Sequence, residues 1–172
     1  MLRQVRNGAL VLTIAAMGVL ACGGNAQAET APVAIEVLTP RAAFTDDASM
    51  QVRLKVDGHD TDVIKAADPS NVVTTRVTVQ PGAQIPWHTH HGPVFVTIAQ
   101  GELTYVSSDG CSRRLYPTGT AFVDPGHGHV HTAYNSGKAV TVFVATFFET
   151  PPGTAPITIP ADGPADCKIP TS

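Results

Sequence analysis

Short apolar segments, separated by glycine and proline turns, restrict this 172-residue sequence to an all-β fold. Residues 52–56 and 73–79 alternate apolar and polar side chains, which is the period of a half-buried strand. Glycine (15) and proline (14) are frequent enough to place a turn between most such segments. Strand-like segments at a spacing of about 10 residues are typical of a sandwich or barrel. We expect further strands at 33–38 (an edge strand), 94–99, 103–106, 114–116, 121–123, 130–134 and 140–148.

The N-terminus has the pattern of an export signal. Arg3 and Arg6 precede an apolar run at residues 9–21, and small residues end the segment at Ala28. The run is shorter than the roughly 20 residues of a membrane span, so we predict a signal peptide at 1–28 and a secreted or periplasmic protein. The alternative is cleavage before Cys22, which would give a lipoprotein anchored through that residue, and a membrane contact is expected only in that case.

The two remaining cysteines predict a disulfide. Under either processing route Cys22 leaves the thiol count, and Cys111 and Cys167 form an even pair in an oxidising compartment. Their bond would close a loop of about 55 residues, worth roughly 4 kcal/mol by chain entropy, and the alternative is two buried free thiols. We therefore predict an N-terminal extension at 29–48, a barrel at 49–149 and an extended Pro-rich tail at 150–172 tied by the disulfide.

Six of the seven histidines fall in two short clusters, at 88–91 and 127–131. Side chains alternate along a strand, so His88 and His90 share one face, and His129 and His131 also share one. Imidazole ligands suit Fe, Mn, Ni, Cu or Zn better than Ca or Mg, which prefer oxygen. The clusters predict a site for one divalent transition metal, while the alternative is a set of surface or hydrogen-bonded core histidines.

Two spaced motifs surround the histidine clusters. The first has Gly82, His88, His90 and Gly101, and the second has Gly119, Pro125, Gly128, His131 and Asn135. In these motifs the sequence resembles the cupins over residues 72–148, with one extra residue between the proline and the glycine of the second motif. The resemblance implies a small six- to eight-stranded jelly-roll barrel and a metal bound by His88, His90 and His131, with His129 or His127 as a candidate fourth ligand.

The main departure from the cupin pattern is Val94, which stands where the family has an acidic ligand. Three neutral imidazoles would leave a divalent ion its full charge, which would attract an anionic ligand in a cavity of low dielectric. Val94 and Val96 are expected to line the pocket, and Trp87 is a further candidate whose alternative is packing on the opposite face from His88. Asp124 is expected to bond its own backbone in a turn.

The functional prediction is an exported metal-binding protein, with a three-His oxygenase or isomerase acting on a small molecule as the first hypothesis. The second is a non-catalytic module that binds a small ligand or a metal, so the sequence leaves enzyme status open. A third is a structural domain that forms a homodimer through its sheet edges. The net charge of −3 offers nucleic acid no basic surface, and hydrolase motifs of the P-loop, nucleophile-elbow and HExxH types are absent from the sequence.

Overall fold

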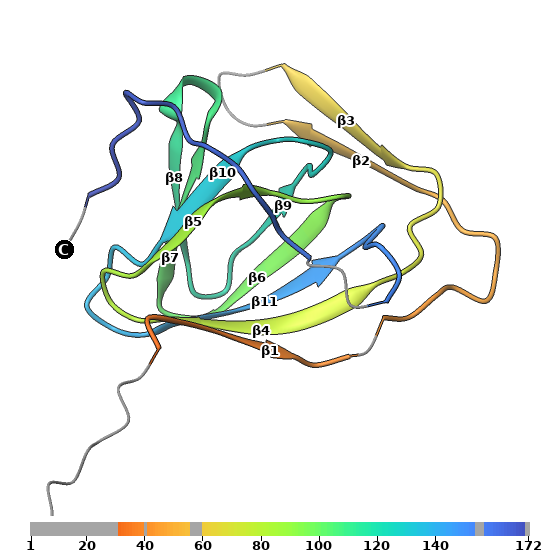
Figure 1. Ribbon diagram of the computed structural model, residues 1–172, viewed down its shortest axis with the longest axis horizontal. Coiled ribbons are helices and arrows are strands. Elements are labelled where there is room, and N and C mark those ends of the chain that lie inside the picture. The colour runs from red at the N-terminus through yellow and green to blue at the C-terminus, as the bar shows by residue number, and fades with distance from the viewer. Residues whose placement is uncertain (1–30, 40, 56–59, 154–156, 171–172) are drawn as a thin grey trace, which may run out of the picture.

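Two five-stranded antiparallel sheets face each other in the computed structural model, which describes residues 31–39, 41–55, 60–153 and 157–170 (Figure 1). Their strand orders are β1-β4-β11-β6-β9 and β12-β5-β10-β7-β8. Together they form the all-β jelly-roll barrel that the sequence predicts. The elements are β1 Val33–Val37, β2 Met50–Lys55, β3 Thr61–Ala66, β4 Val73–Val79, β5 Gln84–Thr89, β6 Val94–Gln100, β7 Glu102–Ser107, the 3₁₀ turn Asp109–Cys111, β8 Arg113–Pro117, β9 Ala121–Asp124, β10 His131–Tyr134, β11 Thr141–Phe147 and β12 Ile159–Pro160.

The strands follow the period-two pattern of their sequences. In β4, Val73, Thr75, Val77 and Val79 are buried, whereas the residues that alternate with them are exposed or half-buried. In β6, Val94, Val96 and Ile98 are buried inside the barrel, whereas Phe95 is only half-buried and Thr97 is exposed. Apolar side chains therefore cover the inner face of each sheet.

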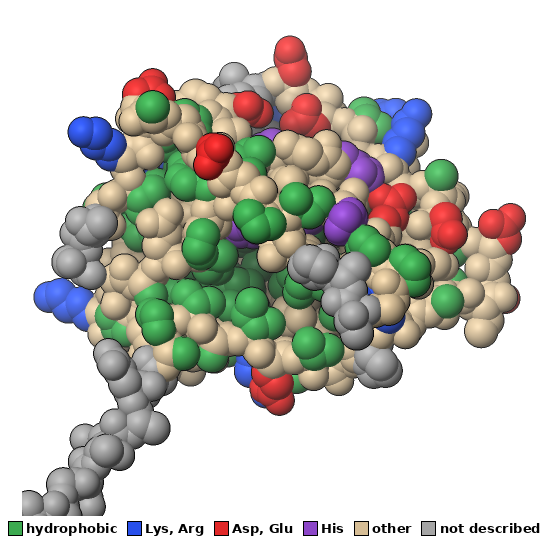
Figure 2. Space-filling model, in the orientation of Figure 1, with side chains coloured by type: hydrophobic (Ala, Val, Ile, Leu, Met, Phe, Trp, Pro, Cys, Tyr) green, Lys and Arg blue, Asp and Glu red, His purple; other side chains and the backbone are tan. Residues whose placement is uncertain are grey.

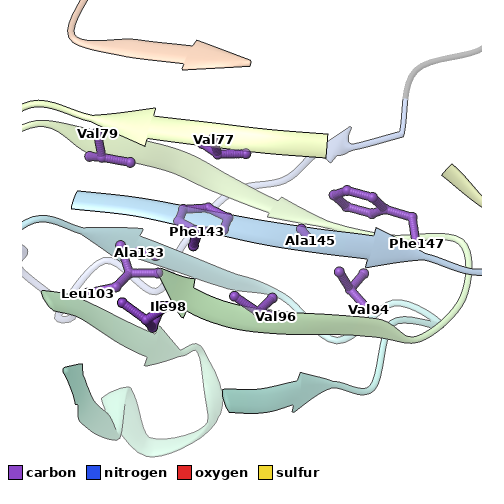
Figure 3. Packing of buried hydrophobic residues seen from close by; sticks show 10 residues of the cluster. All are labelled: Val77, Val79, Val94, Val96, Ile98, Leu103, Ala133, Phe143, Ala145 and Phe147. Atoms are coloured by element: carbon purple, nitrogen blue, oxygen red, sulfur yellow. The ribbon is translucent and has the colours of Figure 1, made fainter. Parts of the chain in front are cut away.

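The core lies between the two sheets, as Figure 3 shows for ten residues whose side chains point toward one another. Leu103 and Ile98 are each 1% exposed, and full burial of such a side chain stabilises the fold by about 1.5–3 kcal/mol. The ten residues are Val77, Val79, Val94, Val96, Ile98, Leu103, Ala133, Phe143, Ala145 and Phe147.

Two glycines bring the connections on either side of the histidine strands together. Gly126 has a φ of 64°, and a Cβ placed on it would lie 1.9 Å from the carbonyl oxygen of Gly92. Only glycine permits this close approach, and glycine also adopts this backbone conformation without steric cost. The β5–β6 connection can therefore pack against the turn after β9, at the end of the barrel where both histidine clusters lie.

The N-terminal segments contribute the expected edge strand and a separate hairpin. β1, within the expected extension at 29–48, pairs with β4 and forms the edge of the larger sheet. Within the described residues, β2 and β3 form a separate two-stranded sheet (Figure 1). The predicted signal peptide at 1–28, with Cys22, lies outside the described residues.

The C-terminal tail crosses the smaller sheet, where it is the dark blue segment of Figure 1. Its strand β12 pairs with β5, and the predicted disulfide between Cys111 and Cys167 joins the tail to the turn before β8. In the described part of the chain, no helix has the length and apolar character needed to cross a bilayer.

The assigned core predicts that an inner and an outer aliphatic residue contribute differently to the free energy of unfolding. Ile98→Ala removes a side chain that is 1% exposed, and we expect it to lower the free energy of unfolding by about 2–5 kcal/mol because it leaves a cavity. Leu115→Ala, at a side chain 50% exposed on β8, is the control and is expected to change it by less than about 0.5 kcal/mol. Urea unfolding measures both, and equal losses would contradict the assigned core.

Candidate functional site

Three histidine rings meet in the interior of the barrel. His88 of β5 and His131 of β10 are directly paired across the two strands, and His90 follows two residues after His88. The ring centroids lie 4.3 Å apart for His88 and His131, 4.8 Å for His88 and His90, and 5.1 Å for His90 and His131. All three residues are buried, and one ring nitrogen of each lies within 4.8 Å of the others.

Backbone carbonyls fix the hydrogen position on two of these rings. His88 Nδ1 donates to the carbonyl oxygen of Pro86 at 2.6 Å, and His90 Nδ1 donates to that of Ile157 at 3.0 Å. A carbonyl oxygen only accepts, so the ring hydrogen is on Nδ1 and the lone pair of the neutral ring is on Nε2. This is the arrangement in which a histidine that binds metal is held by an outer hydrogen bond.

Burial keeps the three rings uncharged near neutral pH. It lowers the pKa of His88, lowers the pKa of His90 to about 4 and lowers the pKa of His131 to about 3. The neighbouring imidazoles oppose protonation of His90 and His131 as well. Neutral imidazole is the form that binds a metal ion, so the site needs no proton release from these rings at pH 7.

Asp124, 1% exposed, lies beside this cluster. Its Oδ1 accepts the backbone N–H of Gly126 at 2.9 Å, which confirms the expected turn. Its Oδ2 accepts the hydroxyl of Tyr105 at 2.5 Å, and it lies 3.3 Å from His129 Nδ1 and 3.1 Å from His131 Nδ1. Burial alone would raise the pKa of Asp124, but the hydrogen bond from His129, the charge that His131 gains when it is protonated in acid and the Tyr105 hydroxyl hold it well below its usual range.

This carboxylate corrects the expectation of a site without a nearby negative charge. Val94 lines the cavity, and its partner across the β6–β9 pair is Asp124. Paired residues of adjacent strands share a face of the sheet. The carboxylate that the sequence lacks at Val94 is therefore present one strand away, where it lies against His131 instead of completing the set with His88 and His90.

The other candidate ligands have different surroundings. His127 is exposed in the turn after β9, with a φ of 50°, and its Nε2 lies 2.6 Å from Glu149 Oε2, so the structure does not bring it to the three rings. His129 belongs to a second group of possible ligands with Asp124 and His131. Its hydrogen bond to Asp124 raises the pKa of His129, and its Nε2 lies 3.0 Å from Ser107 Oγ.

The three rings open into a cavity of about 70 Å³. A single water needs roughly 10–15 Å³ by the same kind of measure, so the cavity holds a few waters or a small ligand group. Most of its wall is apolar, including Val94 and Val96, and Figure 2 shows hydrophobic side chains gathered on one face with histidines beside them. Trp87 lies outside this wall, against Gly163 of the tail, where an added Cβ would come within 2.3 Å of its ring.

The donor set fits a transition metal. His88 and His90 have Nδ1 occupied by a carbonyl and Nε2 available. His131 Nδ1 is buried and makes no hydrogen bond within the described residues, although it lies 3.1 Å from Asp124 Oδ2. Three buried neutral imidazoles with nitrogens in mutual reach are a ligand set for Fe, Mn, Ni, Cu or Zn.

Comparison with known proteins finds a match to one family model. Residues 75–147 match the family model of the cupin domain, and no curated protein matches the sequence. The polyketide cyclase RemF from Streptomyces resistomycificus aligns with 19% identity and a TM-score of 0.45, over 56% of this chain and 64% of its own. KdgF from Halomonas sp. aligns with 16% identity and a TM-score of 0.46, over 73% and 86%.

A cupin-like protein from Thermotoga maritima aligns with 23% identity and a TM-score of 0.42, over 45% of this chain and 56% of its own. This chain therefore covers less than two thirds of RemF and of the Thermotoga protein.

The buried carboxylate predicts a large effect for a small substitution. Asp124→Asn is expected to lower the free energy of unfolding by about 1–3 kcal/mol, because an amide nitrogen cannot accept the Tyr105 hydroxyl. The control is Asp109→Asn, at a side chain 85% exposed, where the expected change is below about 0.5 kcal/mol. NMR titration should also show a lower pKa for His129 in Asp124→Asn, and an unchanged His129 pKa would contradict the assigned hydrogen bond.

The buried rings also predict loss of stability in acid. Their pKa values in the folded, metal-free protein, about 4 for His90 and about 3 for His131, lie below the ordinary 6.5. The unfolded chain therefore binds more protons below pH 6.5, so the stabilisation is complete above that pH and is lost as the pH falls toward 4. Between pH 7 and pH 5, the burial of each of these two rings should lower the free energy of unfolding by about 2 kcal/mol.

The raised pKa of His129 stabilises the folded protein in acid. The total loss of unfolding free energy is therefore smaller than the sum of the contributions from His90 and His131. Comparison with His90→Gln isolates one of them. Urea unfolding at pH 7 and 5 should show a pH dependence about 2 kcal/mol weaker in this variant, and the same dependence in both proteins would be evidence against a buried neutral His90.

Proposed function

We propose that this chain, whose residues 75–147 form a cupin domain, is an exported enzyme that binds one divalent transition metal and acts on a small molecule. His88, His90 and His131 would hold the ion. The observation that supports this proposal most strongly is the meeting of three buried, neutral rings at the wall of a cavity. The predicted signal peptide and the disulfide support export.

Three protein ligands leave open positions on the ion, which would supply Lewis-acid or redox chemistry to a bound small molecule. The apolar wall, with Val94, Val96 and Phe147, excludes water from the reacting group and contacts an apolar part of the ligand. The nearest negative charge is Asp124, which lies against His131. The substrate class that fits is a small molecule with one oxygen group for the ion and an apolar remainder.

Tyr105 is the polar residue of the wall best placed to orient such a ligand. Its ring stacks on His131 with centroids 4.9 Å apart, and its hydroxyl donates to Asp124 Oδ2. Burial raises the pKa of Tyr105, and the Asp124 charge raises it further, so the hydroxyl keeps its proton. Because that proton is already donated, the phenolic oxygen can accept a hydrogen bond from a ligand O–H or N–H.

A second candidate function is a non-catalytic module that binds a small ligand or a metal. The hydrogen bond from Tyr105 to Asp124 favours it. Tyr105 keeps its proton and Asp124 accepts it as a hydrogen bond, so among the residues described above neither is a base of ordinary pKa for a ligand in the cavity. The metal-loaded protein, supplied with oxygen and a panel of small carboxylic acids, ketones and alcohols that each have an apolar remainder, separates the two functions. Turnover of any compound supports the enzyme, whereas saturable binding without turnover supports the module.

Metal content gives the first test of the proposed site. Protein purified without chelators is expected to contain about one equivalent of a transition metal, and His131→Ala should lose most of it because one of three ligands is gone. His91→Ala is the matched control, since His91 lies outside the three-ring cluster and should leave the content unchanged. Elemental analysis measures all three proteins, and a folded wild type that refuses Fe, Mn, Ni, Cu and Zn would refute the proposal.

A further inference from the structure

We infer that the C-terminal tail, residues 157–168, positions the metal ligand His90, and that the Cys111–Cys167 disulfide maintains this arrangement. The inference rests on the proposed function, because it concerns the same metal site. It adds a part of the chain that lies beyond the matched cupin domain of residues 75–147. Ile157 is the positioning residue, acting through its backbone carbonyl.

The contact itself joins residues far apart in the sequence. His90 Nδ1 donates to the Ile157 carbonyl at 3.0 Å across a separation of 67 residues. This bond sets both the tautomer and the orientation of the ring, so it decides whether Nε2 faces His88 and His131. Ile157 and Thr158 also line the cavity, which means that the same segment closes the cavity next to the ligand.

The tail is aligned with the strand that bears the ligands. In the β12–β5 pair, Ile159 is opposite Thr89 and Pro160 is opposite His88. The next residue, Ala161, donates its N–H to the Trp87 carbonyl at 3.1 Å. Continued past Thr89, this register places Thr158 opposite His90 and Ile157 just beyond it, so any shift of the tail along β5 would move the Ile157 carbonyl away from the His90 ring.

A strand of two residues cannot hold this register alone, because short isolated pairings are marginal in water. Two further contacts hold the tail against the smaller sheet. Gly163 packs against the Trp87 ring, with no room for a Cβ, and Cys167 is bonded to Cys111. The disulfide joins the end of the tail to the turn before β8, so the tail stays across the smaller sheet and the entropy cost of forming the contacts at residues 157–161 is reduced.

The test measures metal affinity and the His90 tautomer in the full-length chain. Cys111→Ser/Cys167→Ser is expected to bind Co²⁺ and Zn²⁺ about 10–100-fold more weakly, which is the usual effect of losing an outer hydrogen bond to a ligand. Its Co²⁺ absorption spectrum should change as well, because the ligand geometry differs. Ile98→Ala, a core variant outside the cavity wall, controls for lost stability alone and should keep the wild-type affinity.

A second variant keeps the disulfide. Gly163→Val should displace the tail from Trp87 and weaken metal binding in the same direction, whereas Asp162→Val, one residue earlier at an exposed position, should not. In the metal-free proteins, NMR of the ring nitrogens should show one Nδ1–H tautomer for His90 in the wild type and a mixture of tautomers in Gly163→Val.

The outcomes separate the two proposals. Equal metal affinity and one His90 tautomer in all of these variants would overturn the role of the tail and leave the proposed metal site intact. A wild type that binds neither ion would overturn the proposed function, and this inference with it.

Discussion

Strand pairing in the smaller sheet decides where the imidazoles go, and the candidate site depends on it. β5 lies between β10 and β12, so one neighbour places His131 opposite His88 and the other brings the Ile157 carbonyl to His90. Each ring is then buried and kept neutral. Burial of neutral imidazoles lowers the stability of the fold in acid. In a barrel that bound no metal, apolar side chains at these positions would give greater stability.

The charge near the three rings is more negative than the three neutral imidazole ligands alone would give. Val94 removes the carboxylate from the expected position, but Asp124 carries a buried negative charge across the β6–β9 pair. An ion bound by the three rings would therefore have the Asp124 charge just beyond His131, and this negative charge would reduce the attraction of the ion for anionic ligands. The apolar wall of the cavity then matters more for the choice of ligand than charge alone.

The parts of this structure that follow from local patterns could be predicted from the sequence. The period of residues 73–79 predicts β4, and the spacing of His88 and His90 places both on one face. The site residues that could not be predicted depend on register or on distant contacts. Asp124 faces the rings only because it pairs with Val94, Ile157 reaches His90 from 67 residues away, and Trp87 faces the tail. His127 leaves the cluster because its turn adopts a positive φ beside Glu149.

The central claim is that His88, His90 and His131 bind one ion together, and X-ray absorption spectroscopy of the Zn²⁺-loaded protein tests it most directly. The account predicts three imidazole nitrogens at about 2.0–2.1 Å from the metal, with the remaining positions filled by water or other light ligands. A spectrum with one imidazole or none, in a protein that has bound one equivalent of zinc, would contradict it.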